Sequence, residues 1–197
     1  MKKRKILKDL PEDFQLDQLR ASLAFVTDFS CALDIGAHRG IWTRELLKHF
    51  KQVRAFEPVE QLFRQIPHNN ASCVAYNVAC GNRPGTCDIV PGPRNTGQGS
   101  VTAGLSTPIV VLDNFLPKLN PTFIKIDVEG FEFNVIKGAR EMIMRSKPVI
   151  FIEENGLGKK YGHYHDRASA LLQRWGMKKR AVFYVPPEPD RNVLFTW

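Results

Sequence analysis

Short apolar runs alternate along the chain with segments whose apolar residues recur at helical spacing. The runs are nearly continuous, which is typical of parallel strands that are buried on both faces. They predict strands at 31–35, 52–58, 73–81, 121–127 and 147–155. Apolar residues three or four positions apart predict the helices between them, at 40–50, 59–66, 131–146 and 165–176.

The end of the chain has a different pattern. Two apolar runs, 178–186 and 192–197, are joined by the turn-forming residues PPEPDR, which predicts a β-hairpin. Linked β-α-β units followed by a hairpin predict an α/β fold, a Rossmann-like three-layer sandwich. At 197 residues the chain is most simply one domain, 1–197.

Two stretches fall outside the alternating pattern. Residues 1–29 combine a basic N-terminal arm, which opens MKKRKILK, with a leading helix. Residues 86–111 are rich in Gly, Pro and Ser and predict a mobile, glycine-rich loop between short strands.

Charge and composition narrow the class of protein. The 28 Lys and Arg exceed the 20 Asp and Glu, so the formal net charge is +8, and a nucleic-acid partner on a basic surface stays open. No apolar run approaches the roughly 18 residues of a membrane span, so no membrane partner is expected. The four cysteines form no C-x-x-C pair, which predicts reduced thiols in a cytoplasmic protein and no zinc site.

Small residues follow the strand CALDI, in the loop Gly36-Ala37-His38-Arg39-Gly40. The pattern D-x-G-x-x-x-G, which starts at Asp34, lacks the second early glycine of a dinucleotide fingerprint. An acid before the loop repels phosphate and attracts a cation. The loop therefore predicts a close-lying ligand that has an ammonium group and no phosphates there.

Polar residues follow several of the predicted strands directly. Because ligands bind beyond the carboxyl ends of strands in open α/β sheets, these residues are the candidates for chemistry. Glu57 ends the second strand, where an acid accepts hydrogen bonds from both hydroxyls of a ribose. The others are Asp34, Asn77, Asp127, Glu129, Glu153 and Glu154.

Several motifs together resemble the FkbM-type family of class I S-adenosylmethionine-dependent methyltransferases. They are LDIGAHRGIWT, VRAFEPVEQLF, NVACGNRPG, VVLDNFL, FIKIDVEGFEFNVIKGA and PVIFIEEN, and they span about residues 31–155. The resemblance implies a mostly parallel seven-stranded sheet with a C-terminal antiparallel β-hairpin. One departure is His38, because the family usually has asparagine there.

The resemblance also implies a cofactor, S-adenosyl-L-methionine, with S-adenosyl-L-homocysteine as product. Gly36, Ala37, His38 and Gly40, with Asp34 nearby, would contact its methionine part. Glu57 and the adjoining Pro58 would hold the ribose, and the adenine would lie against Asn77, Val78 and Ala79. Asp127 would lie beside the sulfonium and the acceptor.

For a hydroxyl acceptor, a general base removes the proton as the new bond forms. Asp127 is the first candidate and Glu129 and Glu153 are the next, with His163 and His165 as outsiders. The same acids, with Glu154, are oxygen ligands that suit Mg²⁺, but Glu129 equally suits a helix cap. We expect no required metal.

The family implies an O-methyltransferase acting on a small-molecule or carbohydrate acceptor. The segments 91–104 and 156–166 are the candidates for binding it. Methylation of an RNA ribose 2′-hydroxyl is the alternative, with Lys159, Lys160 and Glu188 as partial matches to the residues such enzymes use. A non-catalytic cofactor-binding protein and a nicotinamide oxidoreductase are further alternatives, the latter disfavoured by the missing fingerprint. Oligomeric state leaves no sequence signal.

Overall fold

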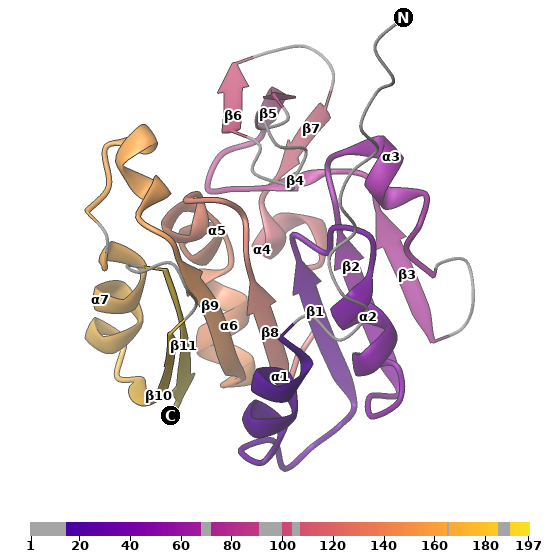
Figure 1. Cartoon of the computed structure of the whole chain (residues 1–197), viewed down its shortest axis with the longest axis vertical. Coiled ribbons are helices and arrows are strands. Elements are labelled where there is room, and N and C mark those ends of the chain that lie inside the picture. The colour runs from indigo at the N-terminus through magenta and orange to yellow at the C-terminus, as the bar shows by residue number, and fades with distance from the viewer. Residues whose placement is uncertain (1–14, 68–71, 91–99, 104–106, 165, 185–189) are drawn as a thin grey trace, which may run out of the picture.

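The computed structural model describes residues 15–67, 72–90, 100–103, 107–164, 166–184 and 190–197. Within these ranges the main element is a seven-stranded sheet of order β10-β11-β9-β8-β1-β2-β3 (Figure 1). Strands β3, β2, β1, β8 and β9 run parallel, and β11 is antiparallel to both of its neighbours. The predicted Rossmann-like three-layer sandwich with a terminal hairpin is therefore confirmed.

The parallel strands coincide with the apolar runs of the sequence. They are β1 (Cys31–Ile35), β2 (Gln52–Phe56), β3 (Cys73–Tyr76), β8 (Phe123–Ile126) and β9 (Val149–Glu154). The hairpin consists of β10 (Lys178–Tyr184) and β11 (Arg191–Thr196). Because β8 and β9 are covered on both faces, nearly all their side chains are buried, which explains why these runs are continuously apolar.

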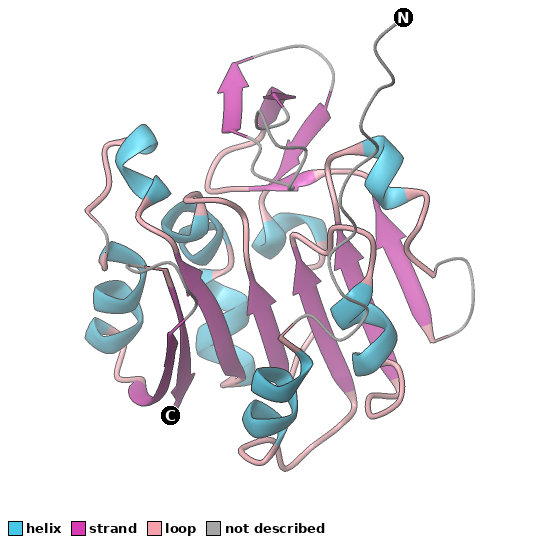
Figure 2. Ribbon diagram, viewed as in Figure 1, coloured by secondary structure: helices cyan, strands magenta, loops and turns pink. Residues whose placement is uncertain are grey.

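Helices cover both faces of this sheet (Figure 2). One face packs on the leading helix α1 (Leu16–Leu23) and on α2 (Ile41–Leu46), through a cluster that includes Trp42, Phe123 and Phe151. The opposite face packs on α4 (Leu112–Phe115), α5 (Glu132–Gly138), α6 (Arg140–Ser146) and α7 (Arg167–Arg174). The short α3 (Glu60–Phe63) follows β2.

A second, smaller sheet stands beyond the edge at which the parallel strands end (Figure 1). Its strands, in the order β4-β7-β5-β6, are β4 (Ala79–Cys80), β7 (Thr107–Val110), β5 (Gly85–Val90) and β6 (Ser100–Ala103). The sequence predicts short strands here, but it also predicts one strand over 73–81. That strand is in fact divided, because the chain leaves the main sheet after Tyr76 and enters the small one at Ala79.

The predicted helix over 131–146 is also divided, into α5 and α6. The break lies at Ala139, next to Gly138, where the backbone of the small sheet approaches the helix closely. A Cβ atom on Gly138 would lie 2.0 Å from the carbonyl oxygen of Gly81. This glycine therefore joins the small sheet to the helical layer.

In the part of the chain that the structure describes, no helix has the length and apolar character needed to cross a membrane.

Candidate active site

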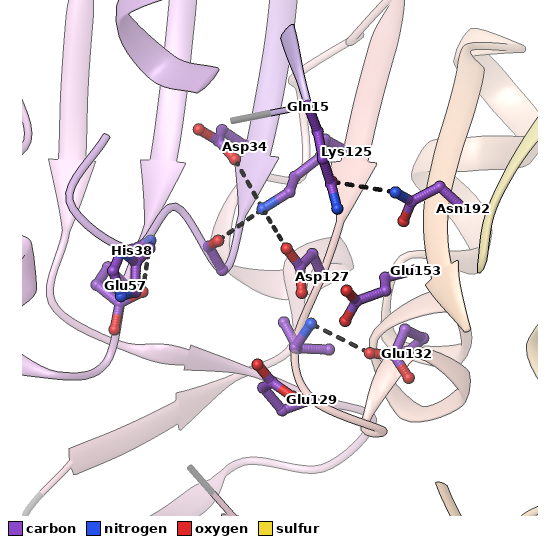
Figure 3. A network of polar contacts seen from close by, with 12 residues as sticks. Gln15, Asp34, His38, Glu57, Lys125, Asp127, Glu129, Glu132, Glu153 and Asn192 are labelled. Carbon is purple, nitrogen blue, oxygen red and sulfur yellow. Dashed lines mark hydrogen bonds and ion pairs between the residues drawn. The ribbon is translucent and has the colours of Figure 1, made fainter. Parts of the chain in front are cut away.

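The polar side chains that follow the parallel strands gather at one edge of the main sheet (Figure 3). Asp34 on β1 pairs in register with Lys125 on β8, and Lys125 pairs with Phe151 on β9. Phe151 belongs to the apolar cluster beneath α1 and α2. Because side chains two positions apart share a face, Asp34, Lys125 and Glu153 lie on that face, at its open end.

The loop at 36–40 is small because the protein itself packs against it. A Cβ on Gly36 would lie 1.7 Å from the carbonyl oxygen of Asp127, and one on Gly40 would lie 3.2 Å from Cα of Ile66. Both glycines have φ near +80°, which other residues rarely adopt. Packing within the protein is thus sufficient to require these glycines, and close approach of a ligand to the loop stays a prediction.

Glu57 lies at the end of β2, and its carboxylate organises the same loop. Its two oxygens accept hydrogen bonds from the backbone N–H groups of His38, at 2.8 Å, and Val59, at 2.9 Å. Burial raises the pKa of Glu57 to about 7, although both backbone hydrogen bonds lower it. Each carboxylate oxygen keeps a lone pair, so Glu57 can still accept bonds from the hydroxyls of a ribose.

Both ring nitrogens of His38 are buried, and its backbone adopts φ +52°. Among the residues that the structure describes, neither ring nitrogen has a hydrogen-bond partner. Burial lowers the pKa of His38, and the nearby Lys125 lowers it further, so the ring is neutral at pH 7. A neutral imidazole offers one donor and one acceptor. The loop therefore fits a ligand with polar groups, such as S-adenosylmethionine.

Asp34 has protein partners in place of solvent. Its side chain is completely buried, Oδ2 accepts a 2.6 Å hydrogen bond from the hydroxyl of Thr43, and Oδ1 lies 3.5 Å from Nζ of Lys125. The sequence predicts a cation beside Asp34, and within the protein that cation is the ammonium group of Lys125. Contact between Asp34 and an ammonium group of a ligand stays a prediction.

The structure brings together three of the predicted acids, Asp127, Glu129 and Glu153. One carboxylate oxygen of each lies within 4.8 Å of those of the other two. Burial raises the pKa of Glu129 to about 8, and burial together with the charges of Asp127 and Glu129 raises that of Glu153. The amide of Asn155 donates hydrogen bonds to both glutamates. This acidic cluster is a place where protons are held near neutral pH.

Two neighbouring acids have other roles. Glu132, and not Glu129, accepts hydrogen bonds from the backbone of the β8–α5 loop, at the N–H groups of Val128 and Gly130. Glu154 turns away from the cluster, and its carboxylate lies 2.8 Å from Nη2 of Arg191. The expectation that Glu154 joins the other acids is therefore wrong, because successive side chains of a strand point to opposite faces.

The predicted adenine-binding residues follow β3. The side-chain amide of Asn77 donates to the carbonyl oxygens of Glu57, at 2.9 Å, and Pro58, at 3.0 Å. Asn77 therefore fixes the ends of β2 and β3 to each other. Val78 packs against the main core and Ala79 is buried at the start of β4. Their contact with an adenine stays a prediction.

The segment 156–166 contains the helix η1 (Leu157–Tyr161) and docks on the loop after β8. A Cβ on Gly130 would lie 2.5 Å from the backbone of Leu157. The ring of His163 packs on Phe133, at 4.7 Å between centroids, and its nitrogens lie close to Arg167 and Asn134. These contacts favour a packing role for His163, and His165 lies outside the described residues.

Sequence reasoning missed Lys125, which is buried in the centre of this site. Its ammonium donates a 2.7 Å hydrogen bond to the carbonyl of Gly36 and lies 3.2 Å from the carboxylate of Asp127. The sequence does contain a signal for this residue, because a lysine within the apolar run FIKI lies in a strand expected to be buried on both faces. Its ammonium group is therefore expected to need a partner inside the protein. Asn155, which bridges the two glutamates, was missed as well.

Known proteins share this fold and sequence pattern. The family of the methyltransferase FkbM domain matches residues 34–179. The FkbM methyltransferase of Methylobacillus flagellatus is 21% identical with a TM-score of 0.56, over 84% of this chain and 43% of that one. This chain thus spans less than half of that protein. A search of curated proteins found no match.

Other solved structures resemble the whole chain at lower identity. A Streptococcus mutans protein in complex with S-adenosylhomocysteine has a TM-score of 0.58 at 12% identity, over 100% of this chain and 99% of that one. An rRNA methylase from Streptococcus thermophilus has a TM-score of 0.55 at 13% identity, over 92% and 95%. These likenesses show the fold alone. The family match covers most of the chain, and the chain therefore belongs to the FkbM family of S-adenosylmethionine-dependent methyltransferases.

Proposed function

We propose that this methyltransferase transfers the methyl group to a hydroxyl oxygen of a small-molecule or carbohydrate acceptor, with Asp127 as the general base. One observation carries the proposal. The side chain of Asp127 is 29% exposed, while its backbone packs directly on Gly36. Gly36 begins the loop 36–40, which we call the cofactor loop because it is predicted to contact the cofactor. A base in this position is accessible to an acceptor and adjacent to the cofactor.

Glu129 takes the proton onward in this proposal. With a pKa raised to about 8, Glu129 exchanges protons near neutral pH, and both it and Glu153 have a carboxylate oxygen close to Asp127. A proton that Asp127 removes from the acceptor hydroxyl can therefore pass to a neighbouring carboxylate. Asp127 is then ionised again for the next turnover.

The cofactor, when bound, supplies a methyl group that is already strongly electrophilic. The protein's task is to align the acceptor oxygen with it and to keep water out. Glu57 and the ring of His38 supply the polar contacts of the cofactor side. Asp127 and Asn155 supply polar groups on the acceptor side, since both line the acidic cluster.

A cytoplasmic location is proposed as well, because all four cysteines are buried thiols that form no disulfide among the described residues. No required metal is proposed. The test is that EDTA leaves methyl transfer unchanged; a loss of transfer that Mg²⁺ restores would contradict it.

The acceptor class is tested with radiolabelled S-adenosylmethionine and a panel of hydroxylated small molecules and sugars. For an acceptor that is methylated, Asp127→Asn is expected to lower kcat by about 100-fold or more. Its affinity for S-adenosylhomocysteine should stay within about threefold, because the amide has the same shape as the carboxylate. Methylation of an amine but of no hydroxyl would refute O-methylation, and unchanged kcat in Asp127→Asn would refute the base.

RNA is the alternative acceptor, and one observation favours it. Lys159 and Lys160 on η1 are exposed, and the charge of Lys160 lowers the pKa of Glu129, so basic residues lie beside the acidic cluster. Glu188, the remaining partial match, lies outside the described residues. Methylation of RNA that falls steeply with salt, with no transfer to small molecules, would support this alternative.

A further inference from the structure

Lys125 is a charged residue in the middle of a buried strand. Its neighbours Ile124 and Ile126 are completely buried, and Lys125 itself is only 5% exposed. An ammonium group in such a place is costly unless its hydrogen-bonding capacity is met. The partners of this lysine therefore indicate its role.

Among the described residues, the ammonium of Lys125 makes a hydrogen bond and two ion pairs (Figure 3). Nζ donates to the carbonyl of Gly36 at 2.7 Å, and it lies 3.2 Å from a carboxylate oxygen of Asp127 and 3.5 Å from one of Asp34. Burial lowers the pKa of Lys125, but the carboxylates of Asp127 and Asp34 outweigh burial and raise it. The lysine is therefore a permanent cation.

Neutralising the charge of Asp34 does not require that Lys125 also contact Gly36 and Asp127. Asp34 and Lys125 are already paired in register on neighbouring strands. The other two contacts reach different elements, since Gly36 lies in the cofactor loop and Asp127 lies at the accessible end of β8. One ammonium thus joins a buried acid, the cofactor loop and the proposed base.

We propose that Lys125 is a positioning residue for methyl transfer, which fixes the cofactor loop relative to the carboxylate of Asp127. The bond to Gly36 holds the loop against β8. The contact with Oδ2 of Asp127 directs that oxygen toward the lysine and leaves Oδ1 outside this contact. The assignment rests on the proposed function, because a base must be held at a fixed distance from the methyl group.

The test must separate this role from that of a counter-charge for Asp34. Lys125→Met alone leaves Asp34 buried and unpaired, which is destabilising in either case. The double variant Asp34→Asn/Lys125→Met removes both charges at similar volume. Asp34→Asn alone is its reference, because Asp34 is itself a predicted cofactor contact. The control is Glu154→Gln/Arg191→Met, which removes the partly buried 2.8 Å ion pair on the opposite face of the sheet.

Thermal unfolding and calorimetric titration with S-adenosylhomocysteine are measured for the wild type, Asp34→Asn and both double variants. We expect Asp34→Asn/Lys125→Met to bind at least about tenfold more weakly than Asp34→Asn, since a hydrogen bond from a charged group to the loop is lost. The control should change the affinity by less than about threefold. An affinity of Asp34→Asn/Lys125→Met equal to that of Asp34→Asn or of the wild type would overturn the proposal.

A further variant, Lys125→Arg, keeps the proposal testable if Asp34→Asn/Lys125→Met does not fold. Lys125→Arg keeps a cation beside Asp34, but its planar guanidinium cannot place donors where the ammonium has them. We expect a similar loss of S-adenosylhomocysteine affinity, and wild-type affinity would again overturn the proposal. No acceptor enters these measurements, so failure of O-methylation would be seen separately, in the acceptor panel.

Discussion

The backbone N–H of His38 donates a 2.8 Å hydrogen bond to the carboxylate of Glu57. This bond joins the loop after β1 to the end of β2, so the two predicted cofactor-binding elements form one unit. A change at Glu57 therefore affects the loop as well as the predicted ribose site.

Glu57→Ala should abolish the stabilisation of the protein by S-adenosylhomocysteine. At about 100 times the dissociation constant, the ligand adds roughly 2.7 kcal/mol to the wild type, or about 5–10 °C in Tm. Differential scanning fluorimetry with and without the ligand measures the shift. Glu60→Ala is the control, because Glu60 is exposed and pairs only with Arg64 among the described residues. A rise in the Tm of the wild type with NAD⁺, and none with S-adenosylhomocysteine, would contradict the assignment of S-adenosylmethionine as the cofactor.

The ring of His38 should be replaceable by asparagine but not by leucine. Both of its nitrogens are buried without a hydrogen-bond partner in the described part of the chain, so a bound ligand is expected to supply the missing hydrogen bonds. Asparagine also offers a donor and an acceptor, and it tolerates φ +52° better than most residues. We expect His38→Leu to weaken S-adenosylhomocysteine binding about tenfold and His38→Asn by less than about threefold. Equal affinity of all three proteins in calorimetry would remove His38 from the site.

Gly36→Ala should unfold the protein or destabilise it by more than about 3 kcal/mol. The new Cβ would lie 1.7 Å from the carbonyl of Asp127, at a φ of +78°. Gly85→Ala is the matched control, because its Cβ meets nothing within 4 Å. It should change the free energy of unfolding by less than about 1 kcal/mol. Urea denaturation compares the two, and a stable Gly36→Ala protein would show that the loop is not packed as described.

Glu132→Gln should stabilise the protein above neutral pH. Burial raises the pKa of Glu132 to about 7 from an ordinary value of 4.5. Between these values the folded protein binds more protons than the unfolded chain, so its stability falls as pH rises. Glutamine keeps an oxygen for the N–H groups of Val128 and Gly130 and removes this loss, which is up to about 3 kcal/mol. Denaturation at about pH 5 and pH 8 should show the gain at the higher pH alone; a gain of equal size at both would contradict it.

The sequence predicts which segments form the parallel strands of the main sheet, because burial on both faces leaves a continuous apolar run. The same reasoning fails at 73–81. The apolar pattern is the same whether the chain stays in one sheet or leaves it for another. Gly138 and Gly81 show why helix α5 ends where it does. That contact joins residues far apart in the sequence, and no local pattern encodes it.

Within the site, the strand-end acids were predictable and their partners were not. Asp127, Glu129 and Glu153 meet because parallel strands end at one edge. Glu154 was misplaced by a single position, which in a strand means the opposite face. The loop glycines were assigned to a ligand, whereas Asp127 and Ile66 pack against them. Only the structure shows which atoms compete for that space.

The small sheet of β4 to β7 has a consequence for the way such a protein diversifies. It satisfies its own backbone pairing and joins the helical layer at Gly81 and Gly138, so its hairpins can vary in length without shifting the register of the main sheet. Apart from Ala79 on β4, the predicted cofactor-binding residues lie outside this small sheet. Selection can therefore reshape one part of the molecule while the other is inherited unchanged.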